Sequence, residues 1–228
     1  MKALIEVFYQ PGKLFQSLPE RRAAWVAPML AGIIIVLFVT ACSINLIGMR
    51  EIMRQRFATS NMSPEQMQQV MARADSPMQV YISYIAVALG IPITLLVVAG
   101  VMTAFGMMTS QTPKFGSMLA MVSLSFFAYW LVNGLMSATI IFITPDRSTL
   151  DVSNIVATNV GAYLDRNSVS KGLYTLFTSL DILSFGLIGL LGYGFSKLTK
   201  ASMVFGVGAV GIVWAMYVAL KMGASTIF

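Results

Sequence analysis

The stretch Trp25–Met49, WVAPMLAGIIIVLFVTACSINLIGM, runs for 25 residues without a charged side chain. A helix of about 20 mostly apolar residues is long enough to cross the hydrocarbon core of a bilayer. The stretch is therefore predicted to be a membrane-spanning helix, and the rest of the chain is interpreted around it.

Four further apolar runs have the same character, and the composition agrees with them. The chain of 228 residues is 57% hydrophobic and only 11% charged, whereas soluble domains carry about 25% charged residues. The predicted spans are about 25–49, 80–108, 115–143, 172–196 and 201–222. The expected fold class is an all-α polytopic membrane protein, with five transmembrane helices in a single membrane domain over residues 25–228 and the two termini on opposite sides.

Short amphipathic helices are predicted outside the spans. Residues 1–24 are expected to form an interfacial N-terminal segment, because apolar and basic side chains alternate between residues 2 and 18. The sequence Ser63-Pro64-Glu65-Gln66 is typical of a capped helix start. A further helix is expected near 152–165, where apolar residues recur at helical spacing.

The missing residue types exclude several kinds of chemistry. The chain has no histidine and one cysteine, Cys42, so it has no Ser-His-Asp triad, no Cys-His pair and no intrachain disulfide. No two acids stand three or four residues apart. The sequence therefore predicts a protein that is not an enzyme and has no metal site and no cofactor. The net charge of +6 comes from scattered Lys and Arg, which favours the lipid bilayer as a partner and not nucleic acid.

Asp181 is the one acid within an otherwise apolar run. A charge in the hydrocarbon costs about 2.5–3.5 kcal/mol on insertion scales, so such a residue is a candidate ion or proton site. The alternative is that Asp181 lies near the headgroups and caps neighbouring backbone. Asn133 and Asn45 are its candidate partners among the intramembrane polar residues. Gly90 and Pro92 predict a kink in the second span.

Small residues are concentrated in the fourth and fifth spans. They let membrane helices approach closely, so these two helices are expected to pack tightly, either on each other or across a homo-oligomer. The glycines assigned to this packing are Gly186, Gly189, Gly192, Gly206, Gly208 and Gly211.

Two regions of the chain resemble a known family. Val7-Phe8-Tyr9-Gln10-Pro11-Gly12-Lys13-Leu14-Phe15 and Trp25-Val26-Ala27-Pro28 resemble the N-terminal part of the Yip domain family, the Rab-GTPase-interacting type of five-span membrane proteins, in its bacterial branch. Asn154-Ile155-Val156, Leu180-Asp181-Ile182-Leu183-Ser184-Phe185 and Gly192-Tyr193-Gly194-Phe195-Ser196-Lys197-Leu198 resemble its last third. The resemblance implies five helices, a cytoplasmic N-terminus, an outside C-terminus and placement in the cell (inner) membrane. The acidic tyrosine-glycine-proline motif of the eukaryotic members is not found, so the resemblance does not extend to Rab binding.

Three functions are left open. The first is a non-enzymatic membrane organiser or adaptor, accessory to another membrane protein or acting as a homo-oligomer. The second is a channel, a transporter or a transporter subunit that uses Asp181. The third, an intramembrane enzyme acting on lipid, is the least favoured because the acids are few and scattered. Seven Lys and Arg on the N-terminal side against eight on the other do not decide the orientation, although the two shortest turns favour a cytoplasmic N-terminus.

Overall fold

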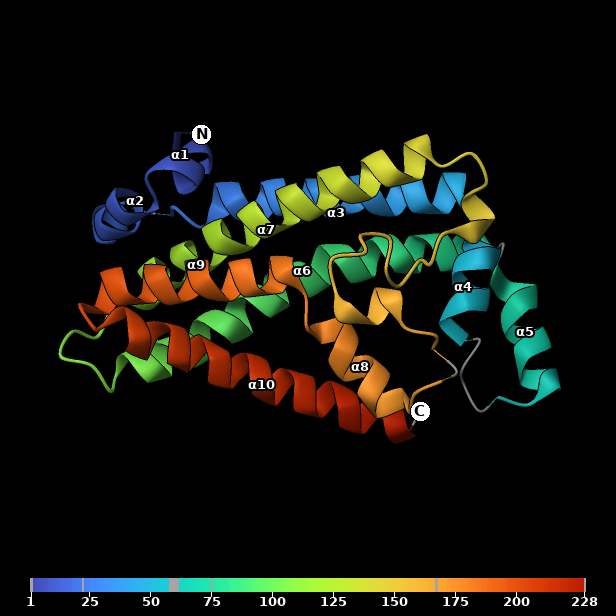
Figure 1. Cartoon of the computed structure of the whole chain (residues 1–228). Coiled ribbons are helices and arrows are strands. Elements are labelled where there is room, and N and C mark those ends of the chain that lie inside the picture. The colour runs from blue at the N-terminus through green and yellow to red at the C-terminus, as the bar shows by residue number, and fades with distance from the viewer. Residues whose placement is uncertain (1, 22, 58–61, 75, 167, 228) are drawn as a thin grey trace.

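The computed structural model describes residues 2–21, 23–57, 62–74, 76–166 and 168–227. Five of its helices are long and apolar enough to cross a membrane (Figure 1). They are α3 (Val26–Leu46), α6 (Pro77–Gly106), α7 (Phe115–Ile143), α9 (Ile182–Thr199) and α10 (Met203–Ile227). The two termini lie at opposite ends of the bundle, as an odd number of spans requires. The prediction of an all-α, multi-pass membrane protein with five spans is confirmed.

The fourth predicted span, 172–196, is wrong as a continuous helix. The structure has a short helix α8 (Lys171–Ser179), a break at Leu180 and Asp181, and then α9. The break exists because the backbone on either side of Asp181 bonds to a distant segment: the Val160 amide donates to the Leu180 carbonyl at 3.2 Å, and the Ile182 amide donates to the Thr158 carbonyl at 3.2 Å. Hydropathy along the chain carries no information on such a pairing.

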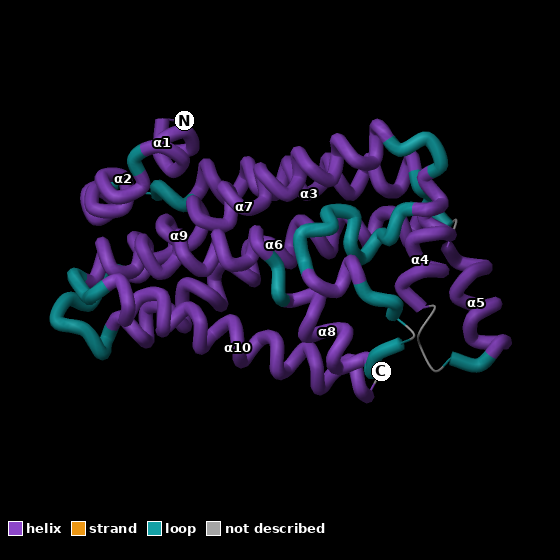
Figure 2. Tube along the Cα trace, viewed as in Figure 1, coloured by secondary structure: helices purple, strands orange, loops and turns teal. Residues whose placement is uncertain are grey.

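The connection between α7 and α8 is also different from the prediction. No α-helix forms over 152–165; this segment is irregular and contains only a 3-10 helix, Val160–Tyr163, which packs against α8. Figure 2 shows its loop trace running from one end of the bundle towards the middle. The predicted apolar stripe does not form one packing face, because Val156 is buried whereas Val160 and Tyr163 are 45% and 79% exposed. The helix is absent because residues 158–160 instead pair with the break before α9.

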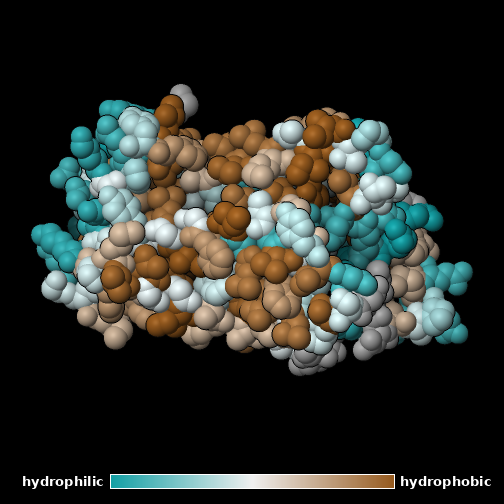
Figure 3. Space-filling model, viewed as in Figure 1, coloured by the Kyte–Doolittle hydropathy of each residue, from teal (hydrophilic) through white to brown (hydrophobic). Residues whose placement is uncertain are grey.

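The core is built around α7, which contacts α3, α6, α9 and the N-terminal helix α1 (Lys2–Tyr9). Its side chains Met118, Met121, Val122 and Leu124 are fully buried. Around them pack buried apolar residues of the neighbouring helices. By contrast, the outer sides of α6 and α10 expose large apolar residues, and Figure 3 shows apolar surface over the middle of this face with hydrophilic residues gathered at both ends. This distribution is the one expected of a protein surrounded by lipid.

The N-terminal segment forms two helices, α1 (Lys2–Tyr9) and α2 (Pro11–Ser17), with Pro11 in the first turn as Pro favours. Several of its apolar side chains pack into the core of the bundle. Leu14, Phe15 and Leu18 are at most 2% exposed and belong to the core cluster, and the Phe8 ring meets Phe127 of α7 edge-on at 6.3 Å. The segment therefore closes one end of the bundle.

Two helices at the other end connect α3 to α6. They are α4 (Met49–Phe57) and α5 (Pro64–Ala74), and they pack on each other. The predicted capping box at the start of α5 is confirmed: the Ser63 amide donates to Gln66 Oε1 at 2.9 Å, and the Gln66 amide donates to Ser63 Oγ at 3.2 Å.

Candidate functional site

Asp181 is the buried acid that the sequence singled out, and it sits at a helix end. Its side chain is the N-cap of α9, in extended backbone with φ −122° and ψ 131°, and the residue is 8% exposed. Thr158 Oγ1 donates to its Oδ1 at 2.5 Å. The amide and the hydroxyl of Ser184 donate to its Oδ2 at 3.0 and 2.9 Å. Both carboxylate oxygens are thus occupied by donors from this chain.

A polar network continues from this break towards the connecting loop. Asn159, which forms an isolated antiparallel bridge with Asp181, donates to Asn154 Oδ1 at 3.0 Å, and Asn154 Nδ2 donates to the Tyr174 hydroxyl at 3.0 Å. The Arg166 guanidinium lies 5.4 Å from the centre of the Tyr174 ring. Burial, reinforced by the nearby Asp151 carboxylate, raises the pKa of Tyr174. The network thus connects α8 and the loop between α7 and α8 to the start of α9.

This arrangement fits the capping alternative for Asp181. A carboxylate at a helix N-terminus stabilises the unpaired amides and the positive end of the helix dipole. Three hydrogen bonds already use most of the acceptor positions of this carboxylate, and within the described ranges no group of three or more His, Cys, Asp or Glu could hold a metal ion.

The predicted partners of Asp181 are wrong. Asn45 is exposed and its Nδ2 donates to the Ala41 carbonyl of its own helix at 2.8 Å. Asn133 is half-buried in α7, and its side chain makes no hydrogen bond with a described residue. The true partners, Thr158 and Ser184, were missed. Ser184 had a local signal, since an Asp followed three residues later by a hydroxyl at the start of an apolar run is a helix-start pattern. Thr158 had none.

The packing glycines divide into two groups. A Cβ added at Gly192 would lie 2.6 Å from Val207 Cα, and one added at Gly206 would collide with the Gly192 carbonyl oxygen. The prediction of tight α9–α10 packing is confirmed at these two positions. A Cβ at the other four would meet no atom within 4 Å: Gly186, Gly189, Gly208 and Gly211.

Other glycine contacts were not anticipated from the sequence. An added Cβ at Gly134 of α7 would lie 2.6 Å from Ile35 Cγ2 of α3, and one at Gly32 of α3 would strike the Trp130 ring of α7. These glycines hold α3 close to α7. Gly90 and Pro92 lie within α6, which stays helical from Pro77 to Gly106, and the kink assigned to them stays a prediction.

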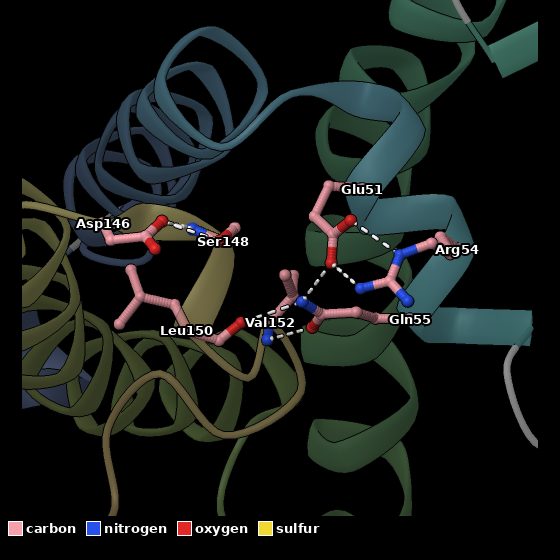
Figure 4. A network of polar contacts seen from close by, with 7 residues as sticks. All are labelled: Glu51, Arg54, Gln55, Asp146, Ser148, Leu150 and Val152. Carbon is pink, nitrogen blue, oxygen red and sulfur yellow. Dashed lines mark hydrogen bonds and ion pairs between the residues drawn. The ribbon is translucent and has the colours of Figure 1, made fainter.

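A second polar cluster joins α4 to the loop after α7 (Figure 4). The side-chain amide of Gln55 bonds to backbone on both sides of Asp151: Nε2 donates to the Leu150 carbonyl at 2.9 Å, and the Val152 amide donates to Oε1 at 2.8 Å. Gln55 Nε2 also donates to Glu51 Oε1 at 2.8 Å. The Arg54 guanidinium donates two hydrogen bonds to the Glu51 carboxylate, from Nε to Oε2 at 2.7 Å and from Nη2 to Oε1 at 2.6 Å. This cluster, named here the Gln55 clasp, holds the loop against α4.

We expect Gln55→Ala to release the loop from α4 without unfolding the bundle. Two backbone groups lose their partners, which costs about 1–3 kcal/mol per group where it is shielded from water. Hydrogen exchange read by mass spectrometry should then rise in peptides containing Val152, while peptides from α7 stay protected. Gln68→Ala, on the exposed side of α5, is the matched control. Unchanged exchange at Val152 would contradict the role of the clasp.

The ionisation of the clasp gives a second prediction. Hydrogen bonds from Arg54 and then from Gln55 lower the pKa of Glu51 below its ordinary value of 4.5, and the bonds from Ser148 likewise lower the pKa of Asp146. A carboxyl with a lowered pKa in the folded state adds stability above its unfolded pKa, and this stability is lost as the pH falls through the folded pKa.

The Tm of the native chain should therefore exceed that of Glu51→Gln at pH 7, and the difference should shrink as the pH is lowered below about 4.5. Because Arg54 keeps 63% of its side chain exposed, solvent screens the pair and the difference is expected to be small. A difference that does not change with pH would show that the charge of Glu51 contributes nothing.

Comparison with family models, with curated proteins and with solved structures found no match. The class that the fold defines is that of a multi-pass, all-α membrane protein with five spans.

Proposed function

We propose that this protein is a non-enzymatic membrane organiser that acts by helix packing, with a second copy of the chain as its first partner. One observation carries the proposal: small residues form a stripe along the outward side of α10, beside exposed large residues such as Ile212 and Met216, and no described residue covers this stripe. Gly208, Ala215 and Ala219 are exposed, Gly211 is half-exposed, and an added Cβ at either glycine would contact no atom within 4 Å.

The chain itself contains an example of what such residues do. Between α9 and α10, Gly192 and Gly206 bring two backbones so close that one added carbon would collide. Between membrane helices, the packing of close backbones replaces the hydrophobic effect as the source of association energy. A helix face made of small residues gains this packing energy only when another helix covers it, and not when it faces lipid.

The geometry of Asp181 supports an organiser over a channel or transporter. The carboxylate already accepts three hydrogen bonds from Thr158 and Ser184, which leaves only about one of its four acceptor positions for an ion. The resemblance to the Yip domain family supports the same proposal, with the inner membrane as location and a cytoplasmic N-terminus.

Cysteine cross-linking tests the self-association. In a Cys42→Ser background, which has no other cysteine, Gly211→Cys should form a disulfide-linked dimer in native membranes. Val210→Cys is the control, because Val210 is 4% exposed and faces the bundle. A monomer in both variants would overturn self-association, and a cross-link to a different membrane protein would replace the second copy by that partner.

Reconstitution in liposomes tests the alternative. If Asp181 carries transport, the native chain conducts an ion or solute and Asp181→Asn abolishes the flux while the protein remains in the membrane. Sealed liposomes with the native chain would support the organiser.

A further inference from the structure

A cavity of about 250 Å³ lies between the N-terminal helix α1 and the start of α3. Its wall is apolar and comes from Leu4, Ala24, Ala27 and Pro28, and its charged lining residues are Lys2 and Arg21. A volume below that of a typical drug-sized site suits a headgroup rather than a large ligand.

The two cations of this cavity are held together by one carboxylate. Glu6 Oε1 lies 3.6 Å from Lys2 Nζ, and Glu6 Oε2 lies 3.3 Å from Arg21 Nη1. An ammonium has three donor hydrogens and a guanidinium five, so the ion pairs with Glu6 leave free donors on both Lys2 and Arg21. Lys2 and Arg21 keep 83% and 38% of their side chains exposed, whereas Glu6 keeps 13%. The exposed side of this trio is therefore cationic.

The cavity lies where the lipid-facing surface of α3 ends. Leu30, Ile34 and Phe38 are 50–67% exposed on successive turns of α3 and form an apolar stripe. Ala27 of the cavity precedes Leu30 by three residues, which is about one turn of the same helix side. The apolar stripe and the cations are therefore about one helical turn apart. Acyl chains and headgroups follow each other in the same order in a bilayer.

The whole end of the molecule that carries the cavity is basic. Its sequence, over residues 1–25, 107–114 and 197–202, holds seven Lys and Arg and the two acids Glu6 and Glu20, a net charge of +5. The rest of the chain, with eight Lys and Arg and seven acids, has a net charge of +1. Figure 3 shows the hydrophilic residues of this end, on the side of α1 and α2 in the view of Figure 1. Anionic groups are thus attracted to this end more than to the other.

We propose that the cavity between α1 and α3 binds the headgroup of an anionic phospholipid. Its phosphate takes the free donors of Lys2 and Arg21, and its glycerol and acyl chains lie over Ala27 and Pro28 towards Leu30. The apolar wall argues for a lipid, since a free phosphate ion gains nothing from it. The site does not depend on self-association through α10.

Native mass spectrometry of the full chain, released from detergent with phosphatidylglycerol or phosphatidylcholine, tests the proposal. The native chain should retain phosphatidylglycerol in preference to phosphatidylcholine. The double variant Lys2→Gln with Arg21→Gln should weaken phosphatidylglycerol binding about ten- to thirtyfold, because each basic residue near an anionic headgroup contributes about one kcal/mol. Arg56→Gln with Arg73→Gln removes two exposed charges from the other end and should leave the preference unchanged.

Two single variants keep the test independent of the folding of the double variant. Ala27→Leu fills the cavity without changing charge and should lower phosphatidylglycerol retention, whereas Glu6→Gln removes the neutralising carboxylate and should raise it. Equal loss in the two double variants would mean general charge attraction and would overturn the site. Equal retention of both lipids, or displacement of the lipid by millimolar inorganic phosphate, would overturn it as well.

Discussion

Replacing Asp181 with alanine is expected to lower the free energy of unfolding by about 2–5 kcal/mol. The change removes the cap of α9, which is the hydrogen bond from the Ser184 amide, worth about 0.5–2 kcal/mol. It also leaves the Thr158 hydroxyl without its acceptor, at about 1–3 kcal/mol where this hydroxyl is shielded from water. Asp181→Asn keeps one acceptor oxygen and should cost less than Asp181→Ala. Denaturation of the purified protein in mixed micelles, followed by circular dichroism, measures both.

A double-mutant cycle separates the contact between Thr158 and Asp181 from the helix cap. Thr158→Val removes the donor that comes from the loop, so the costs of Thr158→Val and Asp181→Asn should not add, with an interaction of about 0.5–3 kcal/mol. Glu65→Gln, an exposed acid in the first turn of α5, serves as control and should show no coupling to Thr158. Additive costs for Thr158 and Asp181 would mean that their short contact contributes nothing to stability.

Replacing Gly192 with alanine is expected to destabilise the protein by about 1–3 kcal/mol, whereas Gly189→Ala should leave stability unchanged or raise it. In a helix alanine is intrinsically better than glycine by about 1 kcal/mol, so an open position gains from the change. At Gly192 the new Cβ would lie 2.6 Å from Val207 Cα and 2.7 Å from Val207 N. Because these are backbone atoms, the clash is relieved only if α10 moves away from α9.

The two alanine variants form a matched pair on one helix. The substituted positions, Gly189 and Gly192, are three residues apart in α9. We expect their effects on stability to differ in sign in the same unfolding assay. Gly206→Ala should behave as Gly192→Ala does, since its Cβ would meet the Gly192 carbonyl oxygen. Destabilisation of equal size at Gly189 and Gly192 would show that α9 and α10 do not meet through these glycines.

The sequence predicted the parts of the structure that depend on neighbours along the chain. The apolar runs predicted α3, α6, α7 and α10 to within a few residues, because hydropathy and helix length are local properties. Ser63 and Gln66 predicted the start of α5 for the same reason, since a capping box closes within four residues. For the candidate site, the sequence identified Asp181 and left two roles open, and the contacts of Asp181 fit the role of a helix cap.

Contacts between distant segments were decided only by the tertiary structure. The helix before Asp181 ends because Leu180 and Ile182 bond to Val160 and Thr158, 20 and 24 positions earlier, and a backbone hydrogen bond across that separation has no effect on local hydropathy. The same holds for the glycines of α9 and α10, of which Gly192 and Gly206 face a neighbouring backbone while Gly189 and Gly208 do not. Composition determined that this chain lies in a membrane, and the relative positions of its helices determined which of its small and polar residues pack, cap or remain open to a partner.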